Sequence, residues 1–436
     1  MRRIFLTSII ILVIAGIALA NPYDMFGNGA RSNGMGWAYT AVAEDVSACY
    51  YNPAGLAQLQ RLQIELGYVY AEAHMFINGH DVGVDKNKGT YIGFAGSTKV
   101  FDHRFSVGVD IFMPDQHVMR FLMLPSTKPQ FVMYANNNHV VAAIVCGGLE
   151  VFKWLYVGGG ASFMGDNYGG VDFKISEREP SIGSLESDIG SLFSPIFGVL
   201  AKPLGSVKVG FTYREKTEVD LNLPNIIKIP ELMVFKNNSI SIISPSQLTL
   251  LATSYSHFSP TQFDFGISWK PLASWLLSLD LNYALYSEFH NPTPYTYVEL
   301  EGGLNELFPV NQMPYPPEPK FKDILITSVG TEVRPLSRKY LDIDIRAGYA
   351  YRPTPVTDYS TGLNFVDSDA HIISAGLGLT FKKFLKILER PLSLDFYYQH
   401  QILEDRKIER PVWDTIGSFE ISGYIPHVGA VLVTRF

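Results

Sequence analysis

The chain has 436 residues, of which 47% are hydrophobic and 18% are charged, and its formal net charge is −7. About a quarter of residues are charged in typical soluble proteins, so this chain is poor in charge, and it is too acidic to bind nucleic acid. No run of about eighteen apolar residues follows residue 20, which excludes a bundle of membrane helices. The 10 histidines are scattered without ligand spacing, so we expect no metal site and no cofactor.

Residues 1–20 read as a secretory signal peptide. Two arginines precede an apolar stretch that ends in Ala18-Leu19-Ala20, a small-x-small cleavage site. An uncleaved anchor helix is the alternative, but the stretch is short for a membrane span. Export allows the two cysteines, Cys49 and Cys146, to form a disulfide, but two unrelated small apolar residues explain them equally well.

Residues 21–60 do not alternate between apolar and polar positions, and they are rich in glycine. Their glycines allow tight backbone turns, and a short helix is expected to start between Asp45 and Ala48 and to end in a turn at Asn52-Pro53. A dinucleotide-binding loop is excluded because no strand precedes the glycines and the G-x-G-x-x-G spacing is absent. We therefore expect a compact segment outside any sheet.

From residue 61 onwards most of the chain alternates with period two, as from Trp275 to Tyr283 and from Ile373 to Phe381. The runs span about ten residues, which is enough for a tilted strand to cross a bilayer, whereas strands of soluble sandwiches have about five or six. The polar positions carry Gly, Ser, Asn and Asp, which suit a crowded lumen. The predicted strands are 62–72, 88–100, 104–114, 138–150, 154–164, 191–203, 206–220, 261–271, 274–290, 321–335, 339–352, 369–383, 391–404 and 419–436.

Short turns recur at triplets of a basic residue, proline and leucine. Proline ends a strand because it has no N–H to donate, and short turns on one side with long loops on the other are typical of an outer-membrane barrel. The sequence therefore predicts an all-β protein, a 14-stranded antiparallel transmembrane barrel over 61–436, with room for an extra hairpin in 165–190. The triplets are Lys202-Pro203-Leu204, Lys270-Pro271-Leu272, Arg334-Pro335-Leu336 and Arg390-Pro391-Leu392.

The last strand ends in Phe436, behind which Val428, Ala430 and Leu432 alternate. A terminal aromatic on such a strand resembles the signal by which outer-membrane barrels are recognised for insertion, with Thr434 as a departure from the usual pattern. This implies two partners, the barrel insertion machinery and the lipid of the bacterial outer membrane. If Leu432 and Phe436 face lipid, Val431 and Val433 face the lumen.

Four motifs before the first strand resemble the N-terminal hatch of the FadL/TodX outer-membrane transport family: Gly29-Ala30-Arg31, Gly34-Met35-Gly36, Ala41 to Asp45, and Asn52 to Leu56. The resemblance is specific over residues 21–60, and beyond them it rests on architecture. It implies a monomeric barrel, plugged by its own N-terminus, that takes up long-chain fatty acids or other hydrophobic small molecules passively. The hatch residues that it implies are Gly34, Gly36, Asp45, Asn52, Pro53, Ala54 and Gly55.

The resemblance also implies a sideways exit into the membrane through a kink in the third strand. Gly108 and Pro114 lie in or near that strand, but a plain glycine and a strand-ending proline are the favoured interpretation. A related group with a similar hatch escorts secreted proteins at the cell surface. A surface barrel that interacts with proteins is therefore the alternative function.

An apolar loop is expected after the seventh strand. An exposed apolar patch tends to mark binding, so we expect a ligand-capture loop outside the membrane, although a lid of loops packed on one another explains the pattern about as well. The candidate capture residues are Ile226, Ile227, Ile229, Leu232, Met233 and Phe235.

Charged residues on the inward faces of the strands are expected to form a polar lumen network that holds the hatch. Its candidates are Asp342, Asp344 and Arg346, with further carboxylates at Asp110, Asp280 and Asp395. An enzyme is not expected. The chain lacks a G-x-S-x-G motif, and His400 lies on the opposite strand face from Ser393 and Asp395, which argues against a triad.

Overall fold

The computed structural model describes residues 23–115, 129–135, 141–174, 182–229, 232–236, 239–243, 245–293, 295–303, 305, 310, 312, 314–357, 364–382, 390–411 and 417–436. The predicted signal peptide, residues 1–20, lies outside them. No helix in this part of the chain is both long enough and apolar enough to cross a membrane.

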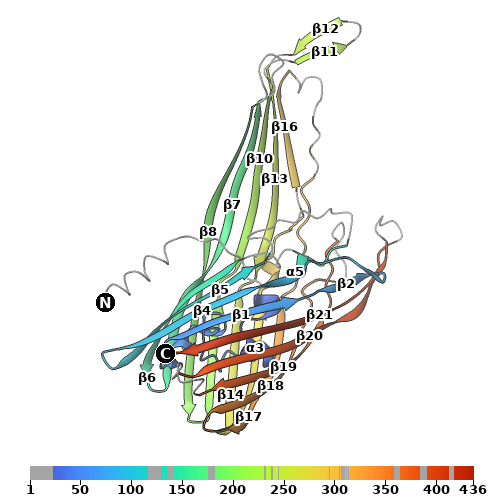
Figure 1. Ribbon diagram of the computed structural model, residues 1–436. Coiled ribbons are helices and arrows are strands. Elements are labelled where there is room, and N and C mark those ends of the chain that lie inside the picture. Colours follow the sequence, from blue (N-terminus) through green and yellow to red (C-terminus); the bar gives the residue numbers. More distant parts are fainter. Residues whose placement is uncertain are drawn as a thin grey trace.

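Fourteen antiparallel strands close into a barrel, as the alternation of the sequence predicts (Figure 1). Each strand pairs with its neighbour, and the last strand pairs with the first from Gln63–Arg435 to Ala71–His427, which closes the ring. The strands are β1 (Gln63–Ala71), β4 (Asn87–Val100), β5 (His103–Pro114), β6 (Ala142–Phe152), β7 (Leu155–Lys174), β8 (Ile182–Leu204), β9 (Val207–Arg214), β14 (Gln262–Leu272), β15 (Trp275–Ala284), β17 (Ile324–Ser337), β18 (Leu341–Arg352), β19 (Ala370–Phe381), β20 (Leu392–Ile408) and β21 (Phe419–Arg435).

The strand faces alternate between lipid and lumen. Leu432 is 40% exposed on the outer face while Val433 is 4% exposed on the inner face, and Val431 and Phe436 follow the same alternation, as predicted. The 11 residues of β14, at about 3.3 Å each and tilted by about 40°, rise about 28 Å, close to the apolar band of about 25 Å in outer-membrane barrels.

The basic–Pro–Leu triplets lie at one end of the barrel, at the short turns. Strand pairing shifts register between Ala201 and Leu204, between Trp269 and Leu272, and between Val333 and Leu336. The shifts occur at the prolines because a residue without an N–H cannot continue the ladder. In an outer-membrane barrel the short turns face the periplasm.

Residues 23–59, called here the inner segment, fold inside the barrel. They contain only short helices: α2 (Tyr23–Phe26), α3 (Ala30–Gly34), α4 (Ala48–Tyr51) and the 3-10 helix η1 (Pro53–Gln58). The helix expected from between Asp45 and Ala48 starts at Ala48. Most of the side chains are fully buried, which places the segment within the lumen (Figure 1).

A tall sheet rises from the end of the barrel opposite the short turns (Figure 1). In this sheet, called here the stalk, the upper part of β7 pairs with β8 and with β10 (Thr217–Ile229), then β10 pairs with β13 (Ser246–Ser259), and β13 with β16 (Tyr295–Gly302). At the tip, β11 (Leu232–Lys236) pairs with β12 (Ser239–Ile243). The 14 residues of β13 alone extend about 45 Å.

Two sequence predictions are therefore wrong. Residues 206–220 are not one strand, because β9 ends at Arg214 and β10 begins at Thr217. The expected apolar loop is not a loop either: Ile226, Ile227 and Ile229 lie in β10, while Leu232, Met233 and Phe235 lie in β11. Runs rich in β-branched residues form strands once partners satisfy their backbone groups, and β13 and β12 supply those partners. The described parts of 165–190 are the upper ends of β7 and β8, which pair with each other up to Lys174 and Ile182.

The lumen above the inner segment is filled by an apolar group called here the upper cluster. Short elements over the barrel mouth contribute to it, among them β2 (His74–Ile77), which pairs with β21 and with β3 (His80–Asp81), α5 (Val132–Ala135) and the 3-10 helix η2 (Tyr286–Glu288). The buried Arg352 lies beside Tyr134 of this cluster and pairs with Asp367 at 2.9 Å. Members of the cluster include Met25, Phe26, Met75, Phe131, Tyr134, Phe258, Tyr286, Phe289, Phe321, Ile421 and Ile425.

Leu279→Arg places a charge on the lipid face at the middle of β15. We expect a loss of about 2–4 kcal/mol in the free energy of unfolding, because no water is available at the bilayer midplane, against about 0–1 kcal/mol near an interface. Leu272→Arg, at the periplasmic end of β14, is the matched control. Guanidinium unfolding in lipid vesicles measures both, and equal losses would contradict this placement in the membrane.

Candidate functional site

The backbone of the inner segment lies directly against the barrel wall. At ten lumen-facing glycines, called here the glycine belt, an added Cβ would lie 3.1 Å or less from an atom of the inner segment. Many of the atoms met are backbone atoms, so only glycine allows this approach. The belt consists of Gly93, Gly108, Gly148, Gly158, Gly198, Gly210, Gly266, Gly330, Gly348 and Gly376.

The glycines predicted from the hatch motifs lie in this contact. A Cβ at Gly34 would lie 3.0 Å from Gly376 Cα, and a Cβ at Gly36 would lie 2.6 Å from the backbone nitrogen of Tyr349. Gly36 also has a positive φ of +62°, which other residues rarely adopt. A Cβ at Gly55 would overlap the carbonyl oxygen of Ala43, so this glycine keeps the inner segment compact.

The Asn52-Pro53-Ala54 motif fixes the start of η1. The side-chain amide of Asn52 donates to the carbonyl oxygens of Thr40 and of Val199 in β8, both at 3.0 Å, and its Oδ1 accepts from the Ala54 N–H at 3.1 Å. Pro53 lies against Gly158 and Gly198 of the belt. The motif therefore links the inner segment to the wall through backbone groups.

Buried carboxylates satisfy other polar groups of the inner segment. Asp280 of β15 accepts from the backbone N–H groups of Tyr39 and Thr40 at 2.7 and 2.6 Å. Asp110 of β5 accepts from the Tyr23 hydroxyl at 3.0 Å and from the side-chain amide of Asn28. Such groups would otherwise be left without partners in the lumen, at about 1–3 kcal/mol each.

Asp45, a predicted hatch residue, acts within the inner segment. Its carboxylate accepts from the Tyr39 hydroxyl at 2.5 Å and from the N–H and hydroxyl of Ser47 at 3.1 and 2.5 Å. It therefore caps the turn that leads into α4.

A chain of ion pairs joins the inner segment to the wall. Arg31 makes a bidentate pair with Glu332 of β17, at 2.7 Å for both nitrogens, and a second pair with Glu44 at 3.1 Å. Glu44 also contacts Lys208 of β9 at 3.3 Å. Burial alone would raise the pKa of Glu44, but Lys208 and Arg31 outweigh it and lower the pKa from 4.5 to about 2.

The predicted lumen network divides into two groups. Arg346 pairs with Glu332 at 2.7 Å and with Asp395 at 2.6 Å, so it is connected to Arg31 through a shared carboxylate. Asp344 instead pairs with Arg334 at 2.7 Å, and Asp342 with Lys382 at 2.7 Å, near the short turns. Of the three candidates, only Arg346 belongs to the chain that reaches the inner segment.

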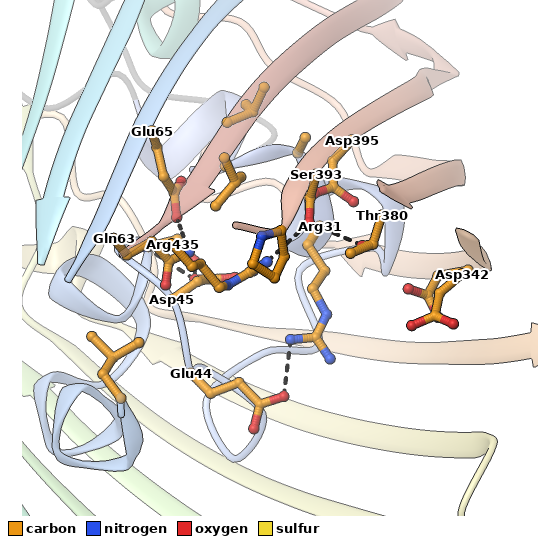
Figure 2. Close-up of a pocket in the computed structure, with 18 of the residues that line it drawn as sticks. Arg31, Glu44, Asp45, Gln63, Glu65, Asp342, Thr380, Ser393, Asp395 and Arg435 are labelled. Atoms are coloured by element: carbon orange, nitrogen blue, oxygen red, sulfur yellow. Dashed lines mark hydrogen bonds and ion pairs between the residues drawn. The ribbon is translucent and has the colours of Figure 1, made fainter. Parts of the chain in front are cut away.

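Both groups line one cavity of about 550 Å³ on the periplasmic side of the inner segment, called here the vestibule (Figure 2). Figure 2 shows the Arg31 side chain reaching towards Glu44, both of the inner segment, and Arg435 reaching towards Ser393, both of the barrel. Basic and acidic side chains both line the vestibule, so it is polar without a strong excess of either charge.

Cys49 of α4 and Cys146 of β6 meet where the inner segment contacts the wall. Both thiols are free and buried, and the Cys146 thiol donates to the Cys49 carbonyl oxygen at 3.4 Å. A hydrogen bond to the Cys146 thiol, together with burial, raises the pKa of Cys49, which makes that thiol a poor nucleophile.

Over its described side chains, one face of the stalk is more apolar than the other. Ile227 pairs with Leu248, which pairs with Leu300, so these three residues form one row across β10, β13 and β16. Two residues along, Leu250 pairs with Val298 on the same face. The alternate face carries Thr249 opposite Ile226 and Glu299. Of the predicted capture residues, Ile227 and Ile229 therefore lie on the apolar face and Ile226 on the other, and Leu232, Met233 and Phe235 lie at the tip.

The third strand, β5, is not kinked in this structure. Its pairing with β4 runs without a register shift from Val100–His103 to Gly89–Pro114. Gly108 belongs to the glycine belt, since its added Cβ would lie 2.7 Å from Cys49 Sγ. This glycine therefore makes room for the inner segment rather than for a bend.

Sequence reasoning missed Glu332, Arg31 and Lys208 as partners in the ion-pair chain. The alternation of β17 indicates that Glu332 faces inward, so the sequence pattern could have identified it as a lumen residue. It could not identify the partner of Glu332, because that depends on strand register. The hatch motif includes Arg31, yet the identity of its partner on β17, 301 positions away, is set only by the closed barrel.

The family model for the outer membrane protein transport protein (OMPP1/FadL/TodX) matches residues 183–420. Among curated proteins, the chain is 23% identical over 391 residues to Alkane uptake protein A of Marinobacter nauticus, covering 83% of this chain and 79% of that protein. Among solved structures it is similar to a Pseudomonas aeruginosa FadL homologue, with a TM-score of 0.55 and 14% identity over 94% of this chain and 97% of the other. The toluene transporter TodX of P. putida gives 0.52 and 13%, over 95% and 99%. These structural similarities show the fold alone.

Gly148→Val tests the glycine belt, with its neighbour Gly147→Val as the matched control. A Cβ at Gly148 would lie 2.9 Å from backbone atoms of Pro53 and Ala57, whereas at Gly147 the nearest atom lies 3.6 Å away. We expect overpacking at Gly148 to destabilise the seated inner segment by about 1–3 kcal/mol or more. Hydrogen exchange of residues 23–59 measures the effect, and equal protection in both variants would contradict it.

Glu44→Gln tests the ion-pair chain through pH. Because the folded pKa of Glu44 is lowered from 4.5 to about 2, its contribution is complete above pH 4.5 and is lost as pH falls towards 2. A carboxylate about one-third exposed is partly screened, so we expect about 1 kcal/mol at pH 7. Urea unfolding of both proteins between pH 7 and 2 should show the difference disappearing, whereas Glu299→Gln on the stalk should show none. A difference that persists at pH 2 would contradict the assignment.

Proposed function

Since the chain belongs to the OMPP1/FadL/TodX family of outer membrane transport proteins, we propose that it takes up hydrophobic small molecules across the outer membrane by passive diffusion. The observation that carries the proposal is an apolar surface outside the membrane, on the stalk, above an apolar cluster that fills the upper lumen. A hydrophobic molecule gains free energy at each apolar surface it covers, so neither step requires coupling to an energy source.

The stalk captures the molecule in this proposal. The row of Ile227, Leu248 and Leu300 is continuous across three strands and only partly buried. Strands hold these side chains in a fixed arrangement, whereas a loop would lose entropy on ordering. Ile229 extends the same capture surface, and Leu232, Met233 and Phe235 belong to β11 at the tip.

The inner segment serves as the hatch in this proposal, with 21–60 as hatch and 61–436 as barrel. Its backbone contacts with the glycine belt and its hydrogen bonds to Asp280 and Asp110 keep the lumen closed. The hatch residues Gly34, Gly36, Asp45, Asn52, Pro53, Ala54 and Gly55 maintain this closure.

Hydrocarbons suit the upper cluster better than fatty acids do. A fatty acid carboxylate needs a cation or several donors once it leaves water. Arg352, the buried cation of this region, is already paired with Asp367 and donates to the Tyr134 hydroxyl at 2.8 Å. Two of the similar proteins, the alkane uptake protein of M. nauticus and the toluene transporter of P. putida, are named for substrates of this class.

A barrel that escorts or anchors secreted proteins is the second candidate. The observation that favours it is the length of the stalk, because a sheet about 45 Å tall exceeds what a small solute needs. Purification of the native protein distinguishes the two candidate functions. Bound hydrocarbon or lipid supports uptake, whereas a secreted protein bound to the stalk with no bound lipid would overturn the uptake function.

Ile227→Asp combined with Leu248→Asp tests capture, with Ile226→Asp combined with Thr249→Asp on the opposite face as the matched control. We expect the first pair to lower the uptake of n-decane about tenfold, because each buried aspartate opposes apolar contact. The measurement is the initial uptake rate in a bacterial host that lacks its own channel of this family. Equal rates in both double variants, with barrels that still resist heat on gels, would remove the apolar face from the mechanism.

A further inference from the structure

In one sector of the barrel wall, formed by β20, β21 and β1, no glycine lies against the inner segment as the glycine belt does. The inward glycines of β21 and β1 near this height face side chains of the barrel instead. The Tyr397 ring occupies the space over Gly429, and the Val431 side chain lies 2.7 Å from the place of a Cβ at Gly67. Side chains, rather than peptide backbone of the inner segment, therefore fill the space over these two glycines.

These side chains form a small apolar group, called here the seam. Ala30 is the member from the inner segment, and the others come from β1, β4, β20 and β21. Except for Val69, which is partly buried, its members are almost fully buried. The seam consists of Ala30, Val69, Tyr91, Tyr397, Val431 and Val433.

Cavities adjoin the seam on both sides. Below it, the vestibule of about 550 Å³ reaches Ala30, Val431 and Val433. Above it, a small cavity of about 20 Å³ is lined by Phe26 of the upper cluster together with Tyr91 and Val69. Gly29 lines both cavities, so the two are separated only by the thickness of the seam.

The inner face of β21 connects these regions in order. Ile421 and Ile425 belong to the upper cluster, His427 lines the small cavity, and Val431 and Val433 line the vestibule. From Ile421 to Val433 this face is apolar except for His427, whose Nε2 is hydrogen-bonded to the Tyr397 hydroxyl at 2.5 Å. One strand thus offers a nearly continuous apolar track from the upper cluster to the periplasmic side.

The wall itself provides no side exit at this height. Pairing is unbroken from β1 through β4 and β5 to β6, and the register shifts between the barrel strands lie at the short turns or, for β20 and β21, above the seam at Leu403–Arg406. Parting two strands inside lipid would leave backbone groups without partners, at several kcal/mol per group.

We propose that a hydrophobic solute passes the inner segment through the seam, along the inner face of β21, and leaves through the vestibule to the periplasm. This rests on the proposed uptake function and assigns its route. The inner segment stays seated on the glycine belt, and the aromatic side chains of Tyr397 and Tyr91 act as the gate.

Rotation of two side chains is a smaller rearrangement than removal of the inner segment. The Tyr91 hydroxyl has no hydrogen-bond partner among the described residues, so its rotation breaks no bond. Rotation of Tyr397 breaks its side-chain hydrogen bonds to His427 and Asn33 and opens the space over Gly429. Unseating the inner segment would instead break the bonds to Asp280 and the ion pairs of Arg31.

The vestibule then favours release. Its lining of paired charges offers an apolar molecule little contact, so the solute has no site in which to remain bound. The volume of about 550 Å³ is within the usual range of about 300–1,000 Å³ for pockets that hold small ligands, so a small solute fits in the vestibule.

The test fills the seam and leaves the rest of the barrel unchanged. Ala30→Trp and Val431→Trp should each lower the initial uptake rate of n-decane about tenfold or more, because a large side chain then occupies the track. Val428→Trp lies on the same strand but faces lipid, and its rate should stay within about twofold of wild type. Tyr397→Ala, which removes the gate, should raise the rate.

The outcomes distinguish a failure of the proposed route from a failure of the proposed function. Wild-type protein that fails to take up n-decane overturns the proposed function. Wild-type uptake together with unchanged rates in heat-resistant Ala30→Trp and Val431→Trp barrels overturns the seam alone. If the tryptophan variants do not fold, Ala30→Leu and Val431→Phe, which add less volume, decide in the same way. A lowered rate in Val428→Trp as well would show that the effect is not specific to the track and would also overturn the seam.

Discussion

The structure depends on one constraint: irregular peptide buried in a lumen must find partners for its backbone N–H and C=O groups. The inner segment has only short helices, the longest being the six-residue η1, and its helices and turns satisfy part of these groups, such as the Tyr51 N–H, which donates to the Ser47 carbonyl at 3.0 Å. The barrel supplies partners for others. Asp280 accepts two N–H groups, Thr212 donates to the Tyr51 carbonyl at 2.7 Å, and Gln401 donates to the Met25 carbonyl at 2.8 Å. The polar lumen is therefore a set of partners for the inner segment.

Such bonds form only if the two backbones approach closely, and the glycine belt permits this. Gly148 pairs with Gly158, and Gly158 with Gly198, so the belt crosses adjacent strands at one height. The ion pairs fix the position of the inner segment more than they stabilise it, since the attraction within a buried pair is largely offset by the cost of removing both charges from water. Because Glu332 contacts both Arg31 and Arg346, the charges of the inner segment and the wall are balanced where they meet.

Much of the barrel could be predicted from the sequence because its constraints are local. Lipid requires alternation along every strand, and Pro203, Pro271 and Pro335 mark the turns through their missing N–H. The stalk could not be predicted in this way, since β10 is a strand only when β13 lies beside it. Likewise, Gly148 is an ordinary strand glycine until the closed barrel places Pro53 against it. Contacts that depend on register between distant strands are not visible in a local pattern.

Contacts made by backbone and contacts made by side chains differ in how easily they open. This difference explains how a plugged channel can be closed and still let a solute pass. A barrel of fourteen strands is wide enough to leak unless it is plugged. A plug held by backbone contacts all around would close it permanently, because backbone cannot rotate away. Where Tyr397 covers Gly429, the contact is made by a side chain with staggered alternatives. A sector of this kind lets a solute pass by exchanging one apolar contact for another, so selectivity follows from the lining of that sector and not from motion of the whole segment.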